Sequence, residues 1–591
     1  MNVFAVFENY LYEGLDSLVK DGVLPENLDY TRITVEPPRN PDHGDIATNV
    51  AMVLAKPAGL KPRHIAEALV EGLKGREMIA GIEIAGPGFL NIRLSETSLR
   101  DIAGYVLKAN RRFAANSFGA GHKVNVEYVS ANPTGPLHIG HTRGAIFGDA
   151  LANLLAWTGH EVCREYYIND AGGQIDTLTQ SVWLRYREAL GEDIDSMPED
   201  SYPGDYLKPV GAALADQYKD TLLSKPEDEW QSVVRDAAVE AMMALIKEDM
   251  ATLGVHHEVF SSERSMIGDG KLEAAIGILQ EKGLLYRGIL KPPKGRESDE
   301  ESGEECAPEP QLLFRSTQFG DDRDRAVQRS NGLFTYFASD IAYHLDKFRR
   351  GYCNMIGVWG ADHSGYIKRL QAMVTAITDG EGAAEIRICQ LVRFLRDAQP
   401  VKMSKRAGEF VSVRDIVNEV GGDAVRFMML YRRNDAPLDF DFEKVKEQSR
   451  DNPIFYVQYA HARICSVLRV AVEPENGLTL QEIEPEVLAG ADFKQISDEL
   501  EMALLRQVAA FPRLIASSAM TREPHRVAFY LYELASTFHA LWNKGRDDSA
   551  LRFIRQDNKP LTLARLGLIT TVAFILAEGL EILGITPARE M

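Results

Sequence analysis

Residues 124–168 read VNVEYVSANPTGPLHIGHTRGAIFGDALANLLAWTGHEVCREYYI, and this stretch decides the fold. It opens with alternating apolar and polar side chains, as a strand does, and a loop rich in proline and glycine follows. The next segment is a predicted helix that ends near Gly159, with apolar residues along one face: Phe147, Ala150, Leu151, Leu154 and Leu155. A second predicted strand, residues 161–168, comes directly after it. Strand, loop, helix and strand in this order predict the opening of a parallel, nucleotide-binding sheet of the Rossmann type.

The rest of the 591-residue chain divides into three predicted domains. Residues 1–112 mix helical and strand patterns and predict a small α/β domain. Residues 113–452 hold the parallel sheet and a helical insertion, and residues 453–591 repeat apolar side chains almost only at helical spacing. The predicted fold class is therefore α/β, with a Rossmann-type parallel-sheet domain between a small α/β domain and an all-α helix bundle.

The charge of the chain bears on its partners. The formal net charge is -20, which argues against a nucleic-acid ligand, because proteins that bind nucleic acid usually carry a basic surface. A mean charge does not forbid a local basic stripe, and an RNA that leaves after each turnover does not need a strongly cationic protein. Part of the acidity lies in residues 297–305, within GRESDEESGEECAPEP, which predicts an exposed connector without chemistry.

The cysteines and the apolar segments bear on the compartment. The five cysteines are scattered and form no CxxC pair, which disfavours a disulfide framework and a zinc site. The N-terminus lacks the pattern of a signal peptide, so we expect a cytoplasmic protein. Only residues 566–585 approach the length of a membrane span, and Glu578 and Glu581 within them favour a buried helix over a membrane partner.

Two histidines in the loop after the first strand are candidates for phosphate chemistry. His138 and His141 stand three residues apart at a predicted helix start, so both rings can face one bound group. A helix N-terminus presents unpaired N–H donors and a positive dipole, which suits a phosphate, and Gly140 leaves room for a ligand. An isolated HxxH pair is more often a surface or core pair, and here the surrounding strand, loop and helix favour the phosphate interpretation.

A second signature lies far along the chain, in PVKMSKRAGEFVSV at residues 400–413. Lys402 and Lys405 flank Met403 and Ser404 in a stretch that contains glycine. Two ammonium groups on a flexible loop suit a polyphosphate leaving group, whose negative charge grows as its bond to the α-phosphorus breaks. A basic loop alone is usually solvated surface, but its combination with the histidine pair is specific.

With both signatures in place, the sequence resembles the class I aminoacyl-tRNA synthetases, whose HIGH and KMSKS motifs match residues 138–141 and 402–406. Arg406 stands where the family motif ends in serine, a change that we expect the loop to tolerate. Four further segments narrow the resemblance to the arginyl-tRNA synthetases: YYINDAGGQI, VWGADHSGY, GGDAVRF and NPIFYVQYAHARI. The match runs from HGDIATN near Asp45 to LTLARLGLI near the C-terminus, so it covers essentially the whole chain.

The resemblance implies a ligase that uses ATP to activate arginine and then transfers it to tRNA(Arg). It assigns catalysis to His138, His141, Lys402 and Lys405, which would stabilise the transition state as the arginine carboxylate attacks the α-phosphate. ATP would arrive as its Mg²⁺ complex, and no protein-bound structural metal is expected. The resemblance also implies a monomer in which amino-acid activation waits for bound tRNA.

The same resemblance distributes the substrate contacts. ATP would lie against residues of both signatures and of the GADH segment: Ala131, Asn132, Pro133, Thr134, Gly135, Pro136, Leu137, His138, Ile139, Gly140, His141, Gly360, Asp362, His363, Met403, Ser404 and Lys405. The α-amino and carboxylate groups of arginine would meet Ser130, Asn132 and His138, with Glu127 close by.

The guanidinium group of arginine requires its own partner. A carboxylate can grip this planar fork with two hydrogen bonds, and Asp340, with Tyr336 one helical turn before it, resembles the family's guanidinium site. The alternative for these two residues is a helix-capping aspartate and a core tyrosine.

The ends of the chain would contact the tRNA. The N-terminal domain resembles the family's additional domain, which meets the outer corner of the tRNA, and Phe89 and Asn91 are its candidate contacts. The helix bundle resembles the anticodon-binding domain of this class. Its candidates are rings and cations that could stack on splayed bases: Tyr456, Tyr459, His461 and Arg463. Helix packing is the alternative for this group.

Three other functions fit parts of the pattern. They are a class I synthetase for another amino acid, a nucleotidylyltransferase and a non-catalytic tRNA-binding relative. Tyr336 and Asp340 favour arginine, the bundle argues against the usually smaller nucleotidylyltransferases, and the intact signatures argue against a non-catalytic relative. Every interpretation of the chemistry depends on one premise, that the paired imidazoles and the distant lysine loop meet around one triphosphate.

Overall fold

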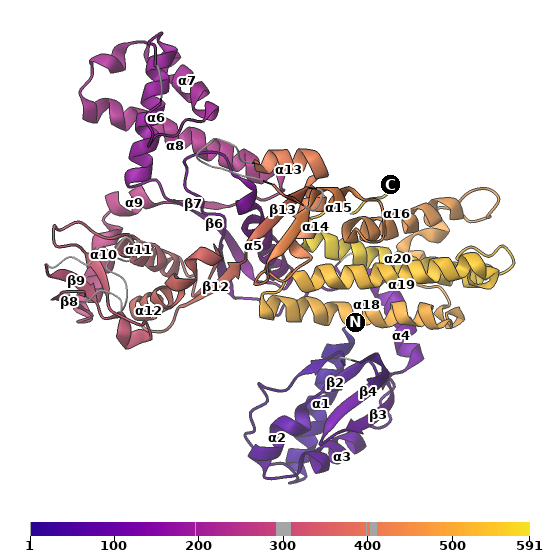
Figure 1. Cartoon of the computed structure of the whole chain (residues 1–591). Coiled ribbons are helices and arrows are strands. Elements are labelled where there is room, and N and C mark those ends of the chain that lie inside the picture. The colour runs from indigo at the N-terminus through magenta and orange to yellow at the C-terminus, as the bar shows by residue number, and fades with distance from the viewer. Residues whose placement is uncertain are drawn as a thin grey trace. The chain divides into compact units, whose positions relative to one another are not determined.

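The computed structural model describes residues 2–38, 40–110, 112–194, 197–290, 309–396, 399–401 and 411–591. It contains two compact units (Figure 1). The first unit comprises residues 1–118, 157–159 and 447–591, and the second unit comprises residues 119–156 and 160–446. The predicted boundaries of three domains stay predictions. The acidic stretch 297–305 and the signature residues 402–406 lie outside the described residues.

A five-stranded sheet organises the second unit, in the order β12-β11-β5-β6-β7. Its strands are β5 (Lys123–Glu127), β6 (Glu161–Ile168), β7 (Val259–Ser262), β11 (Asn354–Gly360) and β12 (Ala383–Cys389). All four pairings are parallel, which confirms the predicted fold class. The chain moves outward from β5 to β6 and β7 on one side and returns to β11 and β12 on the other. This reversal beside β5 is where parallel sheets of this type bind ligands, outside the carboxyl ends of the strands.

The predicted helix after β5 is α5 (Ile139–Trp157), and the five apolar residues expected on its inner face are all buried. Gly159, with φ of 88°, follows the helix end where the sequence placed a stop. The first strand is shorter than predicted, because β5 ends at Glu127. Val129 and Ser130 adopt φ of 69° and 38°, and this left-handed backbone turns the chain out of the sheet.

A helical insertion separates β6 from β7 in the sequence (Figure 1). It contains α6 (Gly173–Ala189), η2 (Asp205–Leu207), α7 (Lys208–Tyr218), η3 (Thr221–Ser224) and α8 (Glu227–Thr252). These helices share a core of their own, in which the rings of Trp183 and Trp230 stack with their centroids 4.0 Å apart. The insertion is therefore a packed subdomain within the second unit.

The remaining elements of the second unit flank the parallel sheet. A three-stranded antiparallel sheet contains β8 (Leu285–Gly288), β9 (Gln311–Phe314) and β10 (Arg325–Gln328), and another small sheet contains β13 (Val392–Arg396), β14 (Gln399–Pro400) and β15 (Leu438–Asp441). The helical elements are α9 (Glu263–Gly268), α10 (Lys271–Glu281), η4 (Ser316–Phe319), α11 (Tyr336–Arg349), η5 (Ala361–Tyr366), α12 (Ile367–Ile377), α13 (Val413–Val420), α14 (Gly422–Leu430) and α15 (Phe442–Lys446). Helices α10, α11 and α12 share one hydrophobic core, so α11 is firmly held.

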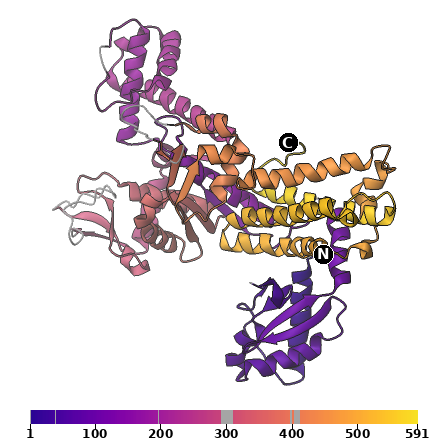
Figure 2. The same ribbon diagram turned by 45° about the vertical axis from the view of Figure 1, so that its right-hand side comes forward.

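The first unit begins with a small α/β region, seen with its strands in view in Figure 2. Its antiparallel sheet has the order β1-β2-β4-β3, from β1 (Val35–Glu36), β2 (Ile46–Thr48), β3 (Ile79–Ala85) and β4 (Phe89–Leu94). Its helical elements are α1 (Val3–Lys20), η1 (Pro41–His43), α2 (Val50–Ala58), α3 (Pro62–Leu73) and α4 (Glu96–Ala109).

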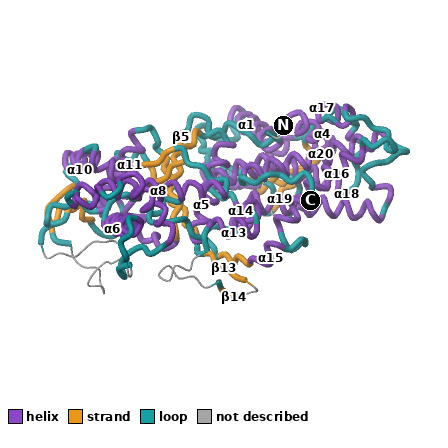
Figure 3. The backbone as a smooth tube through the Cα atoms, turned by 90° about the horizontal axis from the view of Figure 1, so that it is seen from above, coloured by secondary structure: helices purple, strands orange, loops and turns teal. Residues whose placement is uncertain are grey.

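The C-terminal part of the first unit is helical, as predicted. It contains α16 (Pro453–Ala471), η6 (Gln481–Ile483), α17 (Pro485–Leu488), η7 (Phe493–Gln495), α18 (Glu499–Thr521), α19 (His525–Asp547), η8 (Ser549–Leu551) and α20 (Lys559–Ile582). Figure 3 shows α16, α18, α19 and α20 side by side, and their contacts agree.

Helix α20 accounts for the apolar segment near the C-terminus. Among the described residues it is the one helix long and apolar enough to cross a membrane, yet 78% of its most apolar stretch is buried inside the protein. Its fully buried Glu578 accepts hydrogen bonds from the Phe113 and Ala114 backbone and from the Trp157 indole, at 2.9–3.0 Å. The predicted buried helix is confirmed.

Candidate active site

The strained turn after β5 prepares the amino-acid end of the site. A β-branched residue rarely adopts positive φ, and Val129 does so immediately before Ser130. The turn places the Ser130 hydroxyl to donate to Glu127 Oε1 at 3.2 Å and to accept the Tyr167 backbone N–H at 3.1 Å. Two predicted arginine contacts, Glu127 and Ser130, are therefore hydrogen-bonded to each other.

The two signature histidines lie against each other at the start of α5. Their ring centroids are 4.0 Å apart. His138 Nδ1 accepts the Gly140 N–H at 3.1 Å, and His141 Nδ1 accepts the His138 N–H at 3.4 Å. With Nδ1 accepting in both rings, a neutral imidazole at either position would carry its proton on Nε2. The His138 Nε2 atom is buried. A Cβ at position 140 would lie 2.7 Å from the His138 ring, so a larger residue there would displace that ring.

A cavity of about 360 Å³ adjoins this pair. Its lining combines the loop between β5 and α5 with side chains of the helical insertion: Ala131, Asn132, Thr134, Gly135, Pro136, Leu137, His138, His141, Gln174, Tyr202 and Tyr206. Most of the predicted ATP-binding loop therefore faces one cavity.

Three lining residues come from the insertion and were not predicted. Gln174 accepts a hydrogen bond from Asn132 Nδ2 at 2.6 Å, and the Tyr206 hydroxyl donates to the Thr134 carbonyl at 2.9 Å. Gln174 belongs to the YYINDAGGQI segment, whose resemblance could have indicated it. Tyr202 and Tyr206 carry no such signal.

The segment after the lysine signature pairs with the histidine signature. His138 and Ser412 form an antiparallel bridge. Ile139 N donates to Val411 O at 3.1 Å, and Val413 N donates to Leu137 O at 3.1 Å. Residues 402–410 lie outside the described residues, so the predicted roles of Lys402, Met403, Ser404 and Lys405 stay predictions. The described residues 411–413, which follow the lysine signature in the sequence, thus lie against the histidine signature.

The predicted guanidinium site lies at the start of α11. Tyr366 donates a hydrogen bond from its hydroxyl to Asp340 Oδ2. The Tyr336 side chain is 55% exposed, and its hydroxyl lies so close to Gly172 that a Cβ there would be 2.8 Å away. Desolvation, with a smaller contribution from the charge of Glu127, raises the pKa of Asp340 to about 6 against the lowering effect of the Tyr366 hydrogen bond.

A second acidic group, missed by the sequence analysis, accompanies Asp340. Glu263, in the first turn of α9, is 3% exposed, and burial raises its pKa to about 7. The charges of Asp340 and Asp170 contribute to this increase. An acidic residue in the first turn of a helix is common, because it complements the helix dipole, so the pattern alone gave no signal. Two carboxyl groups with raised pKa values form a site that a bound cation would stabilise in the ionised form.

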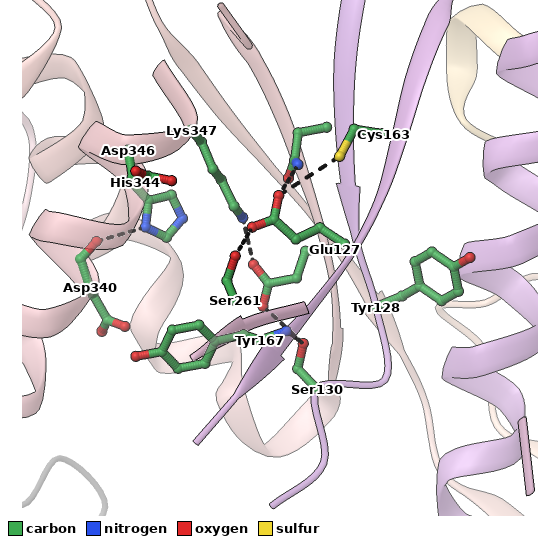
Figure 4. A network of polar contacts seen from close by, with 12 residues as sticks. Glu127, Tyr128, Ser130, Cys163, Tyr167, Ser261, Asp340, His344, Asp346 and Lys347 are labelled. Carbon is green, nitrogen blue, oxygen red and sulfur yellow. Dashed lines mark hydrogen bonds and ion pairs between the residues drawn. The ribbon is translucent and has the colours of Figure 1, made fainter. Parts of the chain in front are cut away.

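Figure 4 shows the side chains that lie between Asp340 and the turn after β5 that carries Ser130. Tyr167 lies between Ser130 and Asp340, with its hydroxyl directed toward Asp340. Burial, together with the charges of Glu263 and Asp340, raises the pKa of the Tyr167 phenol. The Lys347 ammonium forms a 2.6 Å ion pair with Glu127. The Tyr167 ring thus lies between Asp340 and the Ser130 hydroxyl that contacts Glu127.

The predicted adenosine contacts follow β11 at the same sheet edge. Gly360 ends the strand, and the Asp362 and His363 side chains in η5 are 77% and 65% exposed and lie 3.5 Å apart. They are open to solvent, as a ribose contact would need to be.

The predicted tRNA contacts differ in exposure. Phe89 is 43% exposed, whereas Asn91 is buried in β4. His461 is also buried and lies 2.7 Å from the Ala588 carbonyl. The Arg463 guanidinium lies over the rings of Tyr459 and Trp542, 4.2 and 4.7 Å from their centroids.

The ring of Tyr456 faces the His539 ring, with 4.3 Å between their centroids. His461 contacts the segment that follows α20, and Phe89 is the exposed member of the N-terminal pair.

Comparison with known proteins decides the family. The relative from Parvibaculum lavamentivorans named arginine–tRNA ligase is 57% identical over 591 residues, covering all of both chains. The chain belongs to the arginine–tRNA ligase family. A second member, from Ruegeria pomeroyi, is 52% identical over 591 residues and again matches over both full lengths. Among solved structures, Thermus thermophilus arginyl-tRNA synthetase has the same fold, with a TM-score of 0.73, 22% identity and full coverage of both chains.

Four domain families of arginine–tRNA ligases and related enzymes match successive parts of the chain. The Arginyl tRNA synthetase N terminal domain matches residues 8–94, and the class I (R) catalytic domain matches residues 105–196. The class I (I, L, M and V) synthetase family matches residues 330–441, and the DALR anticodon binding domain matches residues 457–591. The sequence identity of 52–57% to arginine–tRNA ligases extends over the full chain. It excludes a nucleotidylyltransferase and favours arginine as the amino acid over those of the other class I families.

Proposed function

We propose that this protein charges tRNA(Arg) with arginine in two steps. ATP first converts the arginine carboxylate to an adenylate with release of pyrophosphate, and the arginine then passes to the 3′ end of the tRNA with release of AMP. The pairing of residues 411–413 with residues 137–139 carries the proposal, because it brings the segment that follows the lysine signature to the histidine pair. Family membership supports arginine as the amino acid.

At the nucleotide end, catalysis consists of positioning and charge stabilisation. The Nε2–H groups of His138 and His141 would donate to phosphate oxygens as charge develops during attack on the α-phosphorus. Lys402 and Lys405 would neutralise the departing pyrophosphate. Gly360, Asp362 and His363 would contact the adenosine. Magnesium would arrive with the ATP phosphates.

At the amino-acid end, two acidic groups would recognise the two cations of arginine. Glu127, together with Ser130, Asn132 and His138, would hold the α-amino and carboxylate groups. Asp340 and Tyr336 would hold the guanidinium, and Glu263 would add a second negative charge beside Asp340. A lysine substrate could not make the paired hydrogen bonds that a guanidinium forms with one carboxylate.

The tRNA would contact both ends of the first unit. Phe89 would meet the outer corner of the tRNA, with Asn91 supporting the strand beneath it. Tyr456, Tyr459, His461 and Arg463 belong to the helical region that matches an anticodon binding domain. The proposal also includes a monomer that works in the cytoplasm. Analytical ultracentrifugation of the purified protein tests the monomer.

One assay tests the whole proposal. Purified protein is incubated with radiolabelled arginine, ATP and magnesium, with and without total tRNA, and acid-precipitable label is counted. Label should appear only with tRNA and ATP. Precipitable label from lysine or glutamate, in place of arginine, would refute the assignment. Pyrophosphate exchange should be absent until tRNA is added, and strong exchange without tRNA would contradict the predicted dependence on tRNA.

A further inference from the structure

One helix reaches both ends of the arginine site. Helix α11 carries Asp340 at the predicted guanidinium end, and Lys347 two turns later contacts Glu127 on β5. Seven residues of α-helix span roughly 10 Å and return to nearly the same face. The spacing between Asp340 and the cation that holds Glu127 is therefore fixed by a rigid element.

The Lys347–Glu127 pair is buried and well oriented. Lys347 Nζ lies 2.6 Å from Glu127 Oε2, and the two side chains are 2% and 12% exposed. The ammonium also lies 4.0 Å from the centroid of the Tyr343 ring. The other carboxylate oxygen, Oε1, accepts the Ser130 hydroxyl. Contacts from two elements thus fix the direction in which Glu127 faces (Figure 4).

A neighbouring ion pair at the C-terminal end of the same helix provides a comparison. Glu165 on β6 is the register partner of Glu127 on β5, and Arg350, the C-cap residue of α11, donates to both of its oxygens at 2.7 and 2.8 Å. Glu165 is 0% exposed and also accepts hydrogen bonds from Asn125 and Ser261. Its carboxylate is enclosed by protein groups, whereas Glu127 belongs with the residues expected to face arginine.

We propose that Lys347 is a positioning residue that holds the Glu127 carboxylate in place for the α-ammonium group of arginine. A buried ion pair adds little net stability compared with an apolar pair, so stability alone does not explain it. Through Lys347, α11 sets the distance between the α-amino end and the guanidinium end of the substrate. The inference rests on the proposed function, in which Glu127 meets the α-ammonium.

The experiment compares KM values for arginine and ATP in tRNA charging by the full-length protein. The variants are Lys347→Met, Glu127→Gln and the double variant, with Arg350→Met as the matched control. Lys347→Met should raise the arginine KM about tenfold, because an ionised hydrogen-bond partner is lost, and should leave the ATP KM within about twofold. Arg350→Met should lower the melting temperature without a selective change in the arginine KM.

The double variant separates positioning from a structural role. Adding Lys347→Met to Glu127→Gln should not raise the arginine KM further, since Lys347 acts only through the Glu127 charge. If the arginine KM of the double variant instead rises by the product of the two single-variant increases, the inference is overturned. The comparison of Glu127→Gln with the double variant does not require that Lys347→Met folds on its own, because the double variant has two neutral side chains in place of the ion pair.

A substrate analogue gives a second readout. Deamino-arginine lacks the α-ammonium, so its inhibition constant should be unchanged by Lys347→Met. If Lys347→Met weakens the binding of arginine and of deamino-arginine by the same factor, the inference is overturned. If the wild-type protein fails to charge tRNA with arginine, the proposed function itself is wrong, and the two failures are thus distinguishable.

Discussion

The amino-acid end and the nucleotide end of the site are held in different ways. Glu127 and Asp340 are fixed by side chains from other parts of the fold, through contacts with Lys347 and Tyr366. In His138 and His141, Nδ1 of each ring instead accepts a backbone N–H of their own loop. The side chains of the predicted adenosine contacts are largely exposed.

This difference assigns selection of the amino acid to one end of the site and the reaction at the phosphates to the other. Partly buried carboxylates with fixed partners suit an end that must distinguish arginine from similar amino acids before reaction. At the nucleotide end, the two histidine rings accept backbone N–H groups, and side chains such as Gln174 and Tyr206 hold the loop that carries them. This arrangement suits an end where charge moves during the reaction and the partners close around a triphosphate. Substitutions at the nucleotide end should therefore change kcat, and substitutions at the amino-acid end should change the arginine KM.

The largest effect is expected at the nucleotide end. His141→Ala removes one proposed donor to the phosphates and should lower kcat for charging by about 10²–10³-fold, with little change in the arginine KM. Steady-state kinetics and single-turnover adenylate formation measure it. The exposed His64, in the first unit, provides the control His64→Ala, which should be near wild type. A kcat for His141→Ala close to that of the wild type would show that the proposed catalytic site is wrong.

Asp340→Asn sharpens the comparison from the other end. Loss of the charged, paired hydrogen bonds to the guanidinium should raise the arginine KM by roughly 10–100-fold while the ATP KM stays nearly constant. Asp346→Asn is the matched control on α11, because Asp346 pairs with Lys271 and Arg350. An equal effect of both variants on the arginine KM would mean that α11 matters only for stability.

The pH dependence of arginine binding follows from two carboxyl groups. Asp340 and Glu263 have pKa values of about 6 and about 7, so both hold protons in mildly acidic solution. Guanidinium binds the ionised forms, so the arginine KM should rise as pH falls, by up to about tenfold per pH unit for each group below its pKa. Glu263→Gln should remove the component near pH 7, and a flat profile would contradict this assignment.

Stability should respond to pH with the opposite sign. A carboxyl pKa raised by folding favours the folded protein when the group is protonated, and that stability is lost as pH rises through the folded value. Without substrate, the contribution of Asp340 and Glu263 should therefore decline between about pH 4 and pH 7. Thermal unfolding with and without arginine checks this, because arginine should raise the melting temperature more at pH 8 than at pH 5.5.

The sequence predicted the parts of the site that local patterns encode. The alternation before residue 128, the apolar face of α5 and the spacing of His138 and His141 all follow from short-range periodicity. The pairing of Lys347 with Glu127 joins positions 220 residues apart, and such a pairing depends on strand order and helix position. The positive φ of Val129 also escaped prediction, because a β-branched residue in an alternating pattern normally extends a strand.

The smallest effect concerns the contact between the insertion and the ATP loop. Tyr206→Phe removes the hydrogen bond to the Thr134 carbonyl, worth about 1 kcal/mol, and should raise the ATP KM about fivefold without changing the arginine KM. Tyr202→Phe is the matched control, because Tyr202 lines the same cavity. Among the described contacts, the hydrogen bond from a tyrosine of the insertion to the Thr134 carbonyl comes from Tyr206 and not from Tyr202. If Tyr206→Phe changed the arginine KM instead, the two ends of the site would share one support, and the division between them would fail.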